Sequence, residues 1–409
     1  MRILLFTGKG GVGKTSVAAA TALAAAGRGL RTLIMSTDPA HSLADSFDQG
    51  LGSEPTLVRD GLWGQQIDVQ QRLEESWREI SSYAVSVLEW AGMSGIEAEE
   101  LTIIPGLDEL FGLADLKRHH DSGAYDLVIV DCAPTGETLR LLSLPEVLSW
   151  YIERIFPVER KVVKAIRPVL NRMKSLPPIA SDDVFGAVER FYRRIEGIKE
   201  ILTDSAVTSV RLVVNPEKMV ISEARRTFTY LSLFQYRVDA VVVNRLIPDD
   251  VSDPYFDRWK SIQAEHLETI ENSFSPVPIL KARLFDREMV GTELLSTLAA
   301  EIYRESDPSA VLFSEETMRV SRRDDGYELR LRIPFAERGD VELMRRDDEL
   351  FVRVGAMKRS IILPQMISRA EVREAGMEDE WLRITFLTAK EERTDERGDS
   401  FQRARAGPA

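Results

Sequence analysis

Hydrophobic positions along this chain follow two different patterns, which indicate two kinds of domain. Through roughly the first 300 residues, short continuous apolar runs alternate with stretches of helical periodicity. Continuous apolar runs are typical of strands that are buried on both faces of a parallel sheet. Helical crossovers between such strands predict a doubly wound α/β domain over residues 1–308. The runs that predict its strands are residues 3–6, 31–35, 127–130, 211–214, 240–243 and 277–280.

Two helical tracts, residues 71–116 and 145–202, hold too many residues to be simple crossovers. We therefore expect them to form a helical subdomain above the sheet. The second tract has a wide apolar face that includes Ile155, Phe156 and Val162. The pattern favours the interpretation that this face forms the core of the subdomain. The alternative is that part of it lines a groove that accepts an apolar helix, which the sequence pattern alone does not favour.

Beyond residues 306–309 the apolar positions alternate strictly with polar ones, which is typical of half-buried antiparallel strands. Asp347 and Asp348 separate two such runs and suit a hairpin turn. We expect a small all-β domain over residues 313–390, and a disordered tail over the charged residues 391–409. The alternating positions are Tyr327, Leu329, Leu331, Ile333, Leu350, Val352, Val354, Leu382, Ile384 and Phe386.

Composition narrows the possible functions. The 409 residues carry a net charge of −13, which argues against a surface that covers nucleic acid. The single cysteine, Cys132, excludes an intrachain disulfide and any zinc site built from several cysteines of one chain, and it fits a reducing compartment such as the cytoplasm. The first predicted strand leaves no room for a signal peptide, and no apolar stretch has the roughly 20 residues of a membrane helix. We expect a soluble cytoplasmic protein.

A phosphate-binding loop directly follows the first predicted strand and precedes a predicted helix. The pattern G-x-x-x-x-G-K-S/T in this context predicts that backbone N–H groups and a helix amino terminus hold the phosphates of a nucleotide. Lys14 is expected to reach the β and γ phosphates, and the Thr15 hydroxyl to bind Mg²⁺. The residues expected to bind ATP here are Gly8, Lys9, Gly10, Gly11, Val12, Gly13, Lys14, Thr15 and Ser16.

Two aspartates end other predicted strands of the same sheet. Asp131 ends the run at residues 127–130, where a carboxylate completes the Mg²⁺ shell directly or through water. Asp38 ends the second strand and precedes Pro39. It either orients the attacking water or caps a helix, and its position alone does not separate the two roles.

Four motifs in this order carry a family resemblance: "KGGVGKTS", "STDPAHSLADSF", "PGLDEL" and "DCAPTGETLR". With them, the chain resembles the arsenical-pump and tail-anchored-protein targeting ATPases, which have a deviant Walker A loop. The resemblance implies that Lys9 crosses a homodimer interface to the partner's nucleotide, and that Asp38 activates the water. It also identifies residues 36–47 and 131–140 as two nucleotide-sensing switches.

The same resemblance implies three further contacts with the nucleotide. Asn244 matches an adenine-recognising asparagine, Glu217 matches an acidic residue that contacts nucleotide across the dimer, and Pro278 opens a loop beside the adenine. This chain departs from the family pattern at Glu137, where the second switch usually has histidine. The metalloid-binding cysteines and the interfacial zinc motif are also absent, so a dimer has to form without zinc.

The C-terminal residues 329–364 and 372–386 resemble an α-crystallin domain, which is fused to such an ATPase in one subgroup of the family. An immunoglobulin-like sandwich has the same alternation of apolar positions. The tail lacks the Ile-x-Ile motif that drives small heat-shock oligomers, so we expect the domain to be an accessory.

Together, these features predict a homodimeric Mg²⁺-dependent ATPase whose nucleotide state opens and closes a hydrophobic client site. The clients would be apolar protein segments, including those of tail-anchored membrane proteins, with transient contact to a membrane or receptor. The alternative is the energising ATPase subunit of an anion transporter, which the missing cysteines disfavour. Cluster-based electron transfer needs more cysteines than this chain has, and a DNA-partition scaffold needs a basic face.

Overall fold

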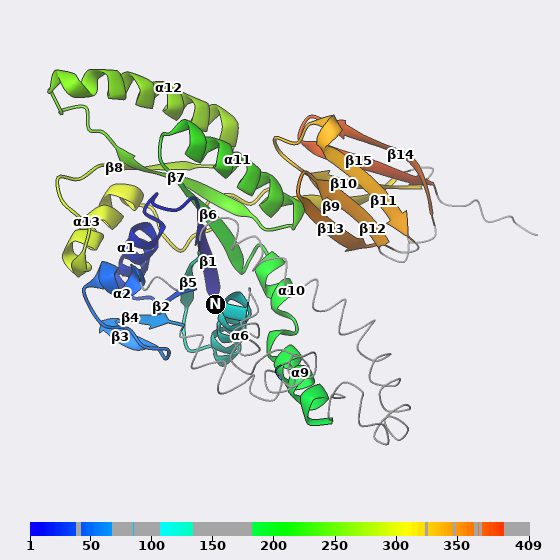
Figure 1. Ribbon diagram of the computed structural model, residues 1–409, viewed down its shortest axis with the longest axis horizontal. Helices are drawn as coiled ribbons and strands as arrows, with labels where there is room; N and C mark the ends of the chain where they lie inside the picture. Colours follow the sequence, from blue (N-terminus) through cyan, green and yellow to red (C-terminus); the bar gives the residue numbers. More distant parts are fainter. Residues whose placement is uncertain are drawn as a thin grey trace, which may run out of the picture.

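The computed structural model describes residues 1–37, 42–67, 85, 107–133, 182–323, 326–346, 349–363, 367 and 370–387. These residues form an eight-stranded sheet with helices, and two antiparallel sheets of four and three strands (Figure 1). The predicted α/β class and the all-β C-terminal part are confirmed. Most of the predicted helical subdomain, with Ile155, Phe156 and Val162, lies outside the described residues, as does the predicted tail.

The large sheet has the strand order β3-β4-β2-β5-β1-β6-β7-β8, and its neighbours are parallel except for β3 and β4. The hairpin of β3 and β4 was not predicted, because β4 carries the polar but buried residues Gln65 and Gln66. The bounds are β1 (Arg2–Thr7), β2 (Thr32–Ser36), β3 (Thr56–Arg59), β4 (Leu62–Gln66), β5 (Leu127–Asp131), β6 (Thr208–Val214), β7 (Val238–Leu246) and β8 (Ile279–Arg283).

The parallel strands bring the loops that follow them to one edge of the sheet. Asp131 at the end of β5 pairs with Phe6 of β1 and with Ser36 of β2, so these three strands end side by side. No helix among the described residues is long and apolar enough to cross a membrane. The helices are α1 (Lys14–Gly27), α2 (Ser42–Phe47), α6 (Leu107–Ser122), α9 (Asp182–Ile195), α10 (Ile198–Thr203), α11 (Lys218–Leu233), η2 (Pro254–Phe256), α12 (Asp257–Phe274) and α13 (Gly291–Tyr303).

The C-terminal sheets have the orders β14-β15-β10-β9 and β11-β12-β13. In β15 the side chains alternate between buried and partly exposed, as the sequence pattern predicts. Arg346 pairs with Glu349 across the predicted hairpin, whose turn residues Asp347 and Asp348 lie outside the described part. The bounds are β9 (Met318–Arg323), β10 (Gly326–Arg332), η3 (Arg338–Asp340), β11 (Val341–Arg346), β12 (Glu349–Val354), β13 (Met357–Ile362), β14 (Glu371–Glu378) and β15 (Trp381–Leu387).

The C-terminal sheets pack directly against α11 of the α/β part. The ring of Phe335 lies 6.1 Å from that of Phe228 in α11 and 5.9 Å from that of Phe274 in α12, between ring centres. Arg359 of β13 donates to the carbonyl of Leu233, the last residue of α11. A cation near the last carbonyls of a helix is favourable, because it opposes the negative end of the helix dipole. The two parts therefore share a continuous apolar and polar interface.

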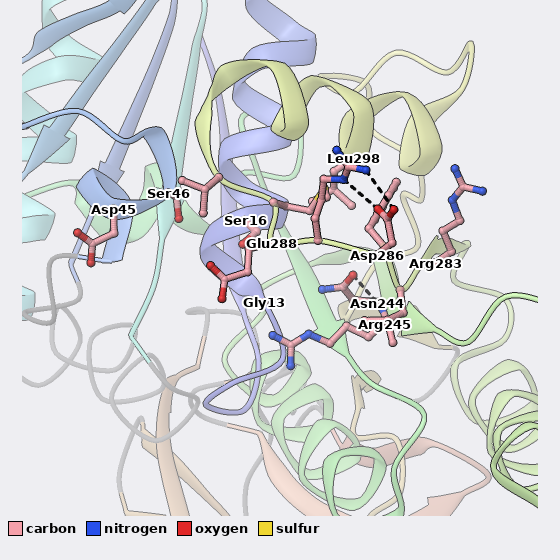
Figure 2. Close-up of a pocket in the computed structure, with 15 residues that line it drawn as sticks. Gly13, Ser16, Asp45, Ser46, Asn244, Arg245, Arg283, Asp286, Glu288 and Leu298 are labelled. Atoms are coloured by element: carbon pink, nitrogen blue, oxygen red, sulfur yellow. Dashed lines mark hydrogen bonds and ion pairs between the residues drawn. The ribbon is translucent and has the colours of Figure 1, made fainter. Parts of the chain in front are cut away.

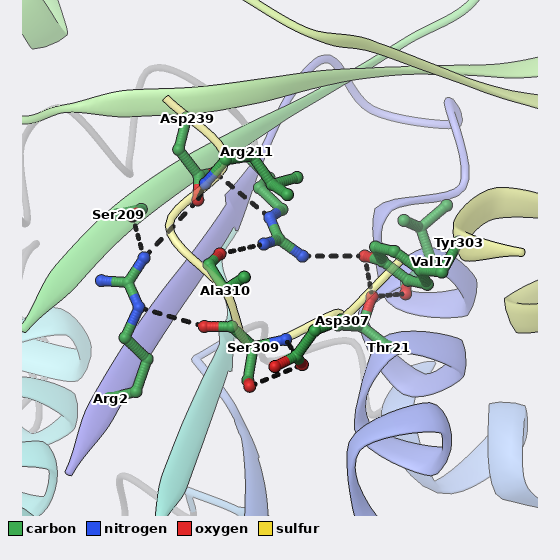
Figure 3. A network of polar contacts seen from close by, with 11 residues as sticks. Arg2, Val17, Thr21, Ser209, Arg211, Asp239, Tyr303, Asp307, Ser309 and Ala310 are labelled. Atoms are coloured by element: carbon green, nitrogen blue, oxygen red, sulfur yellow. Dashed lines mark hydrogen bonds and ion pairs between the residues drawn. The ribbon is translucent and has the colours of Figure 1, made fainter. Parts of the chain in front are cut away.

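A buried polar network ties the segment between the two parts to the large sheet (Figure 3). Arg211 of β6 donates to Asp239 of β7 at 3.1 Å, to the Tyr303 hydroxyl at 3.0 Å and to the Ala310 carbonyl at 3.2 Å. Arg2 of β1 forms a second ion pair with Asp239, at 3.5 Å. The side chains of Arg211 and Asp239 are fully buried. A single carboxylate thus balances two guanidinium groups in the sheet.

We expect Asp239→Asn to destabilise the protein by about 3–5 kcal/mol, because it leaves buried arginine charge without a carboxylate. The free energy of unfolding in urea measures this effect. Asp126→Asn is the matched control, because it removes the carboxylate of an ion pair with Arg31 that is exposed to solvent. Equal losses of stability in the two variants would contradict the importance of the buried network.

Candidate nucleotide site

The loop between β1 and α1 owes its shape to glycines. A Cβ added at Gly8 would lie 2.2 Å from the carbonyl oxygen of Val213 in β6, so the loop can approach this neighbouring strand only without a side chain. Gly11 and Gly13 have φ angles of 81° and 92°, which residues other than glycine rarely adopt. Gly13 is the N-cap of α1, so the loop leads directly to the positive end of that helix. This is the geometry of a phosphate cradle.

The two lysines of the loop have different surroundings. Lys14 begins α1 and is only 8% exposed. Its Nζ donates to the backbone carbonyl of Lys9 at 3.4 Å, so the charged end of Lys14 folds back over the loop. Lys9 is partly buried, and its neighbours Gly10 and Gly11 are exposed. One lysine thus lies inside the cradle, and the other is on its open limb.

Two pairs of oxygen-bearing residues lie at the ends of the strands and helices around the phosphate loop. Asp131 is fully buried at the end of β5. Its backbone carbonyl accepts a hydrogen bond of 3.2 Å from the N–H of Thr37, which follows β2. The Thr15 hydroxyl at the start of α1 lies 3.3 Å from the Ser42 hydroxyl at the start of α2. Hydroxyl and carboxylate oxygens are donors of the kind that Mg²⁺ prefers.

Two asparagines support the loop from the ends of β6 and β7. Asn244 donates from Nδ2 to the Val12 carbonyl at 2.9 Å, and its Oδ1 accepts from the N–H of Arg245 at 2.9 Å. With its amide nitrogen turned toward the loop, Asn215 lies 3.2 Å from the same carbonyl oxygen. Sequence reasoning found Asn244 and missed Asn215, although the position of Asn215 directly after a predicted strand was a usable signal.

A cavity of about 570 Å³ opens beside Gly13 and Asn244 (Figure 2). Its volume falls in the range of about 300–1,000 Å³ that is usual for sites of small ligands. Side chains of Leu284 and Val290, which are exposed, give it apolar walls. The full lining is Gly13, Ser16, Asp45, Ser46, Asn244, Arg245, Arg283, Leu284, Phe285, Asp286, Arg287, Glu288, Met289, Val290 and Leu298.

Charges of both signs surround this cavity. Arg287 donates to the carboxylate of Asp286 at 2.9 and 3.1 Å, which lowers the pKa of Asp286 and keeps the pair ionised. The guanidinium of Arg283 lies 5.1 Å from the ring centre of Phe285. The apolar walls with basic groups at the rim suit a planar base that is joined to a charged group.

The structure brings most of the predicted residues together, but not all of them. Pro278 is absent from the cavity lining. It lies just before the amino end of β8, where its carbonyl accepts a hydrogen bond from the N–H of Val241 in β7, whereas the cavity lies at the carboxyl end of β8. The segment that Pro278 opens does reach the cavity, through residues 283–290, which sequence reasoning missed. Glu217 is exposed at the N-cap of α11. Asp38 and Glu137 lie outside the described residues.

Comparisons with known proteins agree with this geometry. The chain matches the family model described as "Anion-transporting ATPase" over residues 1–304, and the model described as "HSP20-like domain found in ArsA" over residues 324–386. These matches confirm the family resemblance and the α-crystallin-like character of the C-terminal sheets.

Two of the relatives match nearly the whole chain, and a third matches about seven tenths of it. A protein of Chlorobaculum tepidum, whose name describes an arsenical pump-driving ATPase, is 42% identical over 396 residues, which cover 96% of this chain and 97% of that one. A similarly named protein of Aquifex aeolicus is 38% identical over 397 residues, which cover 94% of this chain and 99% of that one. The "ATPase ASNA1 homolog" of Trypanosoma cruzi is 29% identical over 318 residues, 71% of this chain and 88% of that one.

We expect Gly13→Ala to weaken ATP binding at least tenfold, about 1.4 kcal/mol. The new Cβ would lie 2.4 Å from Nδ2 of Asn244 and would disturb the phosphate loop and the cavity together. Gly29→Ala is the control, because Gly29 also has a positive φ, of 87°, but no atom within 4 Å of an added Cβ. Titration with a fluorescent ATP analogue measures both affinities. An unchanged affinity in Gly13→Ala, or an equal loss in both variants, would contradict this assignment of the site.

Proposed function

Since the chain belongs to the anion-transporting ATPase family and is an ATP hydrolase, we propose that it works as a homodimer with Mg²⁺, and that its nucleotide state opens and closes a site for hydrophobic protein segments. The observation that carries the proposal is the open limb of the phosphate loop. Lys14 is buried and its Nζ folds back over the loop, whereas Gly10 and Gly11 are exposed and Lys9 is partly exposed. A second copy that closes over this face would bring its own Lys9 to the nucleotide.

The residues of this chain divide the work of hydrolysis. The loop N–H groups and Lys14 bind the phosphates, and the base enters the cavity beside Asn244. Thr15 and Asp131 would hold Mg²⁺, which would supply positive charge to neutralise the phosphates. Support for these roles comes from the short distance between the Thr15 and Ser42 hydroxyls, and from the buried carboxylate of Asp131 at the same edge.

Asp38 and the partner's Lys9 complete the site in this proposal. Asp38 directly follows Thr37, whose N–H binds the carbonyl of Asp131, so the chain leaves β2 beside the magnesium ligands. As a carboxylate it would orient the attacking water. Lys9 from the second copy would stabilise the charge that develops on the transferred phosphoryl group, as an arginine finger does. Glu217, which is exposed at the same edge, would contact the partner's nucleotide.

Base recognition combines polar and apolar contacts. In this conformation Nδ2 of Asn244 is engaged with Val12, so recognition of adenine by this amide requires its release from that carbonyl. Leu284 and Val290 would cover the faces of the base, and Pro278 would act by fixing the start of β8.

The client is proposed to be an apolar protein segment, such as one from a tail-anchored membrane protein. The support is the family resemblance and the similarity to the "ATPase ASNA1 homolog", while the apolar face that would hold the client lies outside the described residues. The α-crystallin-like sheets would assist from their position on α11. We place this work in the cytoplasm, with transient contact to a membrane or receptor.

An anion-pump role is the second candidate, because the names of the relatives in C. tepidum and A. aeolicus describe an arsenical pump-driving ATPase. The chemistry of this chain is less favourable to it. Its single cysteine, Cys132, is only 1% exposed, next to Asp131. A thiolate site for a metalloid needs accessible sulfur, which this buried side chain does not offer.

Mixing of variants tests the composite site. Lys9→Ala chains and Asp38→Asn chains each lack one catalytic group in every site of their own homodimers. Each homodimer should therefore hydrolyse ATP at least about 10³-fold more slowly than the wild type. A heterodimer restores one complete site. With random exchange of chains, an equal mixture should recover about a quarter of the wild-type turnover. Lack of recovery, with exchange confirmed by mass spectrometry, would contradict action of Lys9 in trans.

Capture of clients separates the two candidate functions. Asp38→Asn chains with ATP should hold the closed state, so crosslinking followed by mass spectrometry should enrich apolar transmembrane segments relative to Lys14→Ala chains, which bind ATP weakly. The competing outcome is stimulation of ATP hydrolysis by arsenite or antimonite with no enrichment of such segments, and it would favour the anion-pump role.

A further inference from the structure

The side-chain amide of Gln66, the last residue of β4, is buried without a hydrogen-bond partner among the residues that the structure describes. Gln66 is only 3% exposed, and neither its Nε2 nor its Oε1 is engaged. Its backbone is satisfied, because its N–H donates to the Gly52 carbonyl at 2.9 Å. A buried amide that makes no hydrogen bonds costs free energy, so its presence in a folded protein needs a specific explanation.

The preceding residue, Gln65, shows that this part of the fold is able to satisfy a buried amide. Its Nε2 donates to the Ser53 carbonyl at 2.8 Å and to the Asp115 carboxylate at 3.0 Å, and its Oε1 lies 2.7 Å from Nε2 of His119. Asp115 and His119 belong to α6, so the side chain of Gln65 points to the face of the sheet that α6 covers. Successive side chains of a strand point to opposite faces. The side chain of Gln66 therefore points away from α6.

The face opposite to α6 carries α1, which follows the phosphate loop. One row of paired residues crosses five strands of the large sheet and directs its side chains to the same face. Arg211 in this row donates to the hydroxyl of Tyr303 in α13, which lies 2.7 Å from the hydroxyl of Thr21 in α1 (Figure 3). The row therefore faces α1 and α13. Its members, across β4, β2, β5, β1 and β6, are Gln66, Ser36, Asp131, Phe6 and Arg211.

Gln66 lies at the edge of the sheet where the nucleotide is expected. Ser36 and Asp131 are the last residues of β2 and β5, as Gln66 is of β4. Neighbouring strands are about 4.8 Å apart, so about 10 Å separates the backbones of Gln66 and Asp131. Two side chains joined by one water bridge a gap of this width. At the same edge, the Thr15 hydroxyl lies 3.3 Å from that of Ser42. The amide of Gln66 thus lies on the side of the groups that are proposed to hold Mg²⁺.

Water fits the chemistry of this amide better than a phosphate or a metal ion does. The amide has one side that donates and one that accepts, whereas phosphate oxygens mainly accept and Mg²⁺ takes only oxygen ligands. A water molecule both donates and accepts, and a buried water typically makes about three hydrogen bonds to polar groups that are otherwise unsatisfied. In some GTPases a glutamine amide orients the attacking water.

We propose that Gln66 is a positioning residue for ATP hydrolysis, whose amide holds an ordered water on the phosphate side of β2 when nucleotide and Mg²⁺ are bound. This inference rests on the proposed function and adds to it a residue that lies outside all four family motifs. The water is either the one that attacks the γ phosphate or one that is bound to Mg²⁺, and both need the same amide. The unsatisfied amide destabilises the nucleotide-free chain, and the loaded site removes this cost.

The test is Gln66→Met, which keeps the approximate shape of the side chain and removes its amide. An apolar group of similar shape in place of an unsatisfied buried polar group is neutral or stabilising. The free energy of unfolding of the nucleotide-free variant in urea should therefore equal or exceed that of the wild type. The kcat at saturating ATP and Mg²⁺ should fall at least about tenfold, while the KM for ATP stays within about twofold, because the lost contact matters in the transition state.

Gln65→Met is the matched control on the opposite face of the same strand. It removes an amide that is fully engaged with Ser53, Asp115 and His119, so it should lower the free energy of unfolding. Its kcat for each folded chain should stay at the wild-type value. The two neighbouring glutamines should thus show opposite patterns, in which one affects turnover and the other affects stability.

The dependence on Mg²⁺ identifies the water. If the water is bound to Mg²⁺, Gln66→Met should raise the Mg²⁺ concentration that gives half-maximal binding of a fluorescent ATP analogue. If it is the attacking water, this concentration should stay unchanged while kcat falls. A Gln66→Met chain with wild-type kcat, or one destabilised as much as Gln65→Met, would overturn the role of Gln66 and leave the ATPase site standing. A wild type that hydrolyses ATP equally well without Mg²⁺ would instead overturn the proposed function.

Discussion

Parallel pairing of the central strands is the constraint on which the site depends. Because Asp131 pairs with both Phe6 and Ser36, the ends of β5, β1 and β2 are held in one line by backbone hydrogen bonds. The phosphate loop, the proposed magnesium ligands and the start of the first switch follow directly from these ends. A slip in register would move every one of these groups by at least about 3 Å along the sheet. The chemistry therefore depends on buried apolar strands that never touch the nucleotide.

The sequence was most informative where structure is local. Glycines with a lysine and threonine at fixed spacing specify the loop by themselves, and continuous apolar runs specify buried strands. Prediction was poorest where a residue's role depends on distant partners. Gln65 looks like a loop residue, yet it is buried because its amide donates to Ser53 and to the carboxylate of Asp115. Likewise, Asn215 gains its place only because β6 lies beside the phosphate loop.

The cavity beside Asn244 illustrates the same limit. The family resemblance points to Pro278 because it opens the segment that resembles the adenine-side loop, and residues 283–290 of this segment line the cavity. Its contribution comes five or more residues later, at the far end of β8, where Leu284 and Phe285 leave the sheet. The length of β8 decides which residues lie at its carboxyl end, beside the cavity, and sequence patterns place the ends of strands only to within a few residues. The segment after Pro278 therefore lines the cavity, and the role of Pro278 itself stays a prediction.

Helix α11 connects the two functional regions of the molecule. It follows β6 at the carboxyl edge of the sheet, with Glu217 at its N-cap, and it ends at Leu233, whose carbonyl accepts from Arg359 of the α-crystallin-like part. The buried pair of Arg211 and Asp239 fixes the connecting segment near the same sheet. A C-terminal part attached in this way would move with the α/β part rather than apart from it.

The central claim is that two copies share each nucleotide site, and the dependence of turnover on protein concentration tests it most directly. Hydrolysis per chain should be close to zero when the protein is diluted below the dissociation constant of the dimer, and should rise to a plateau as the dimer forms. The midpoint should coincide with the midpoint of dimer formation measured by sedimentation under the same conditions. A turnover per chain that stays constant while the mass changes from monomer to dimer would contradict the account.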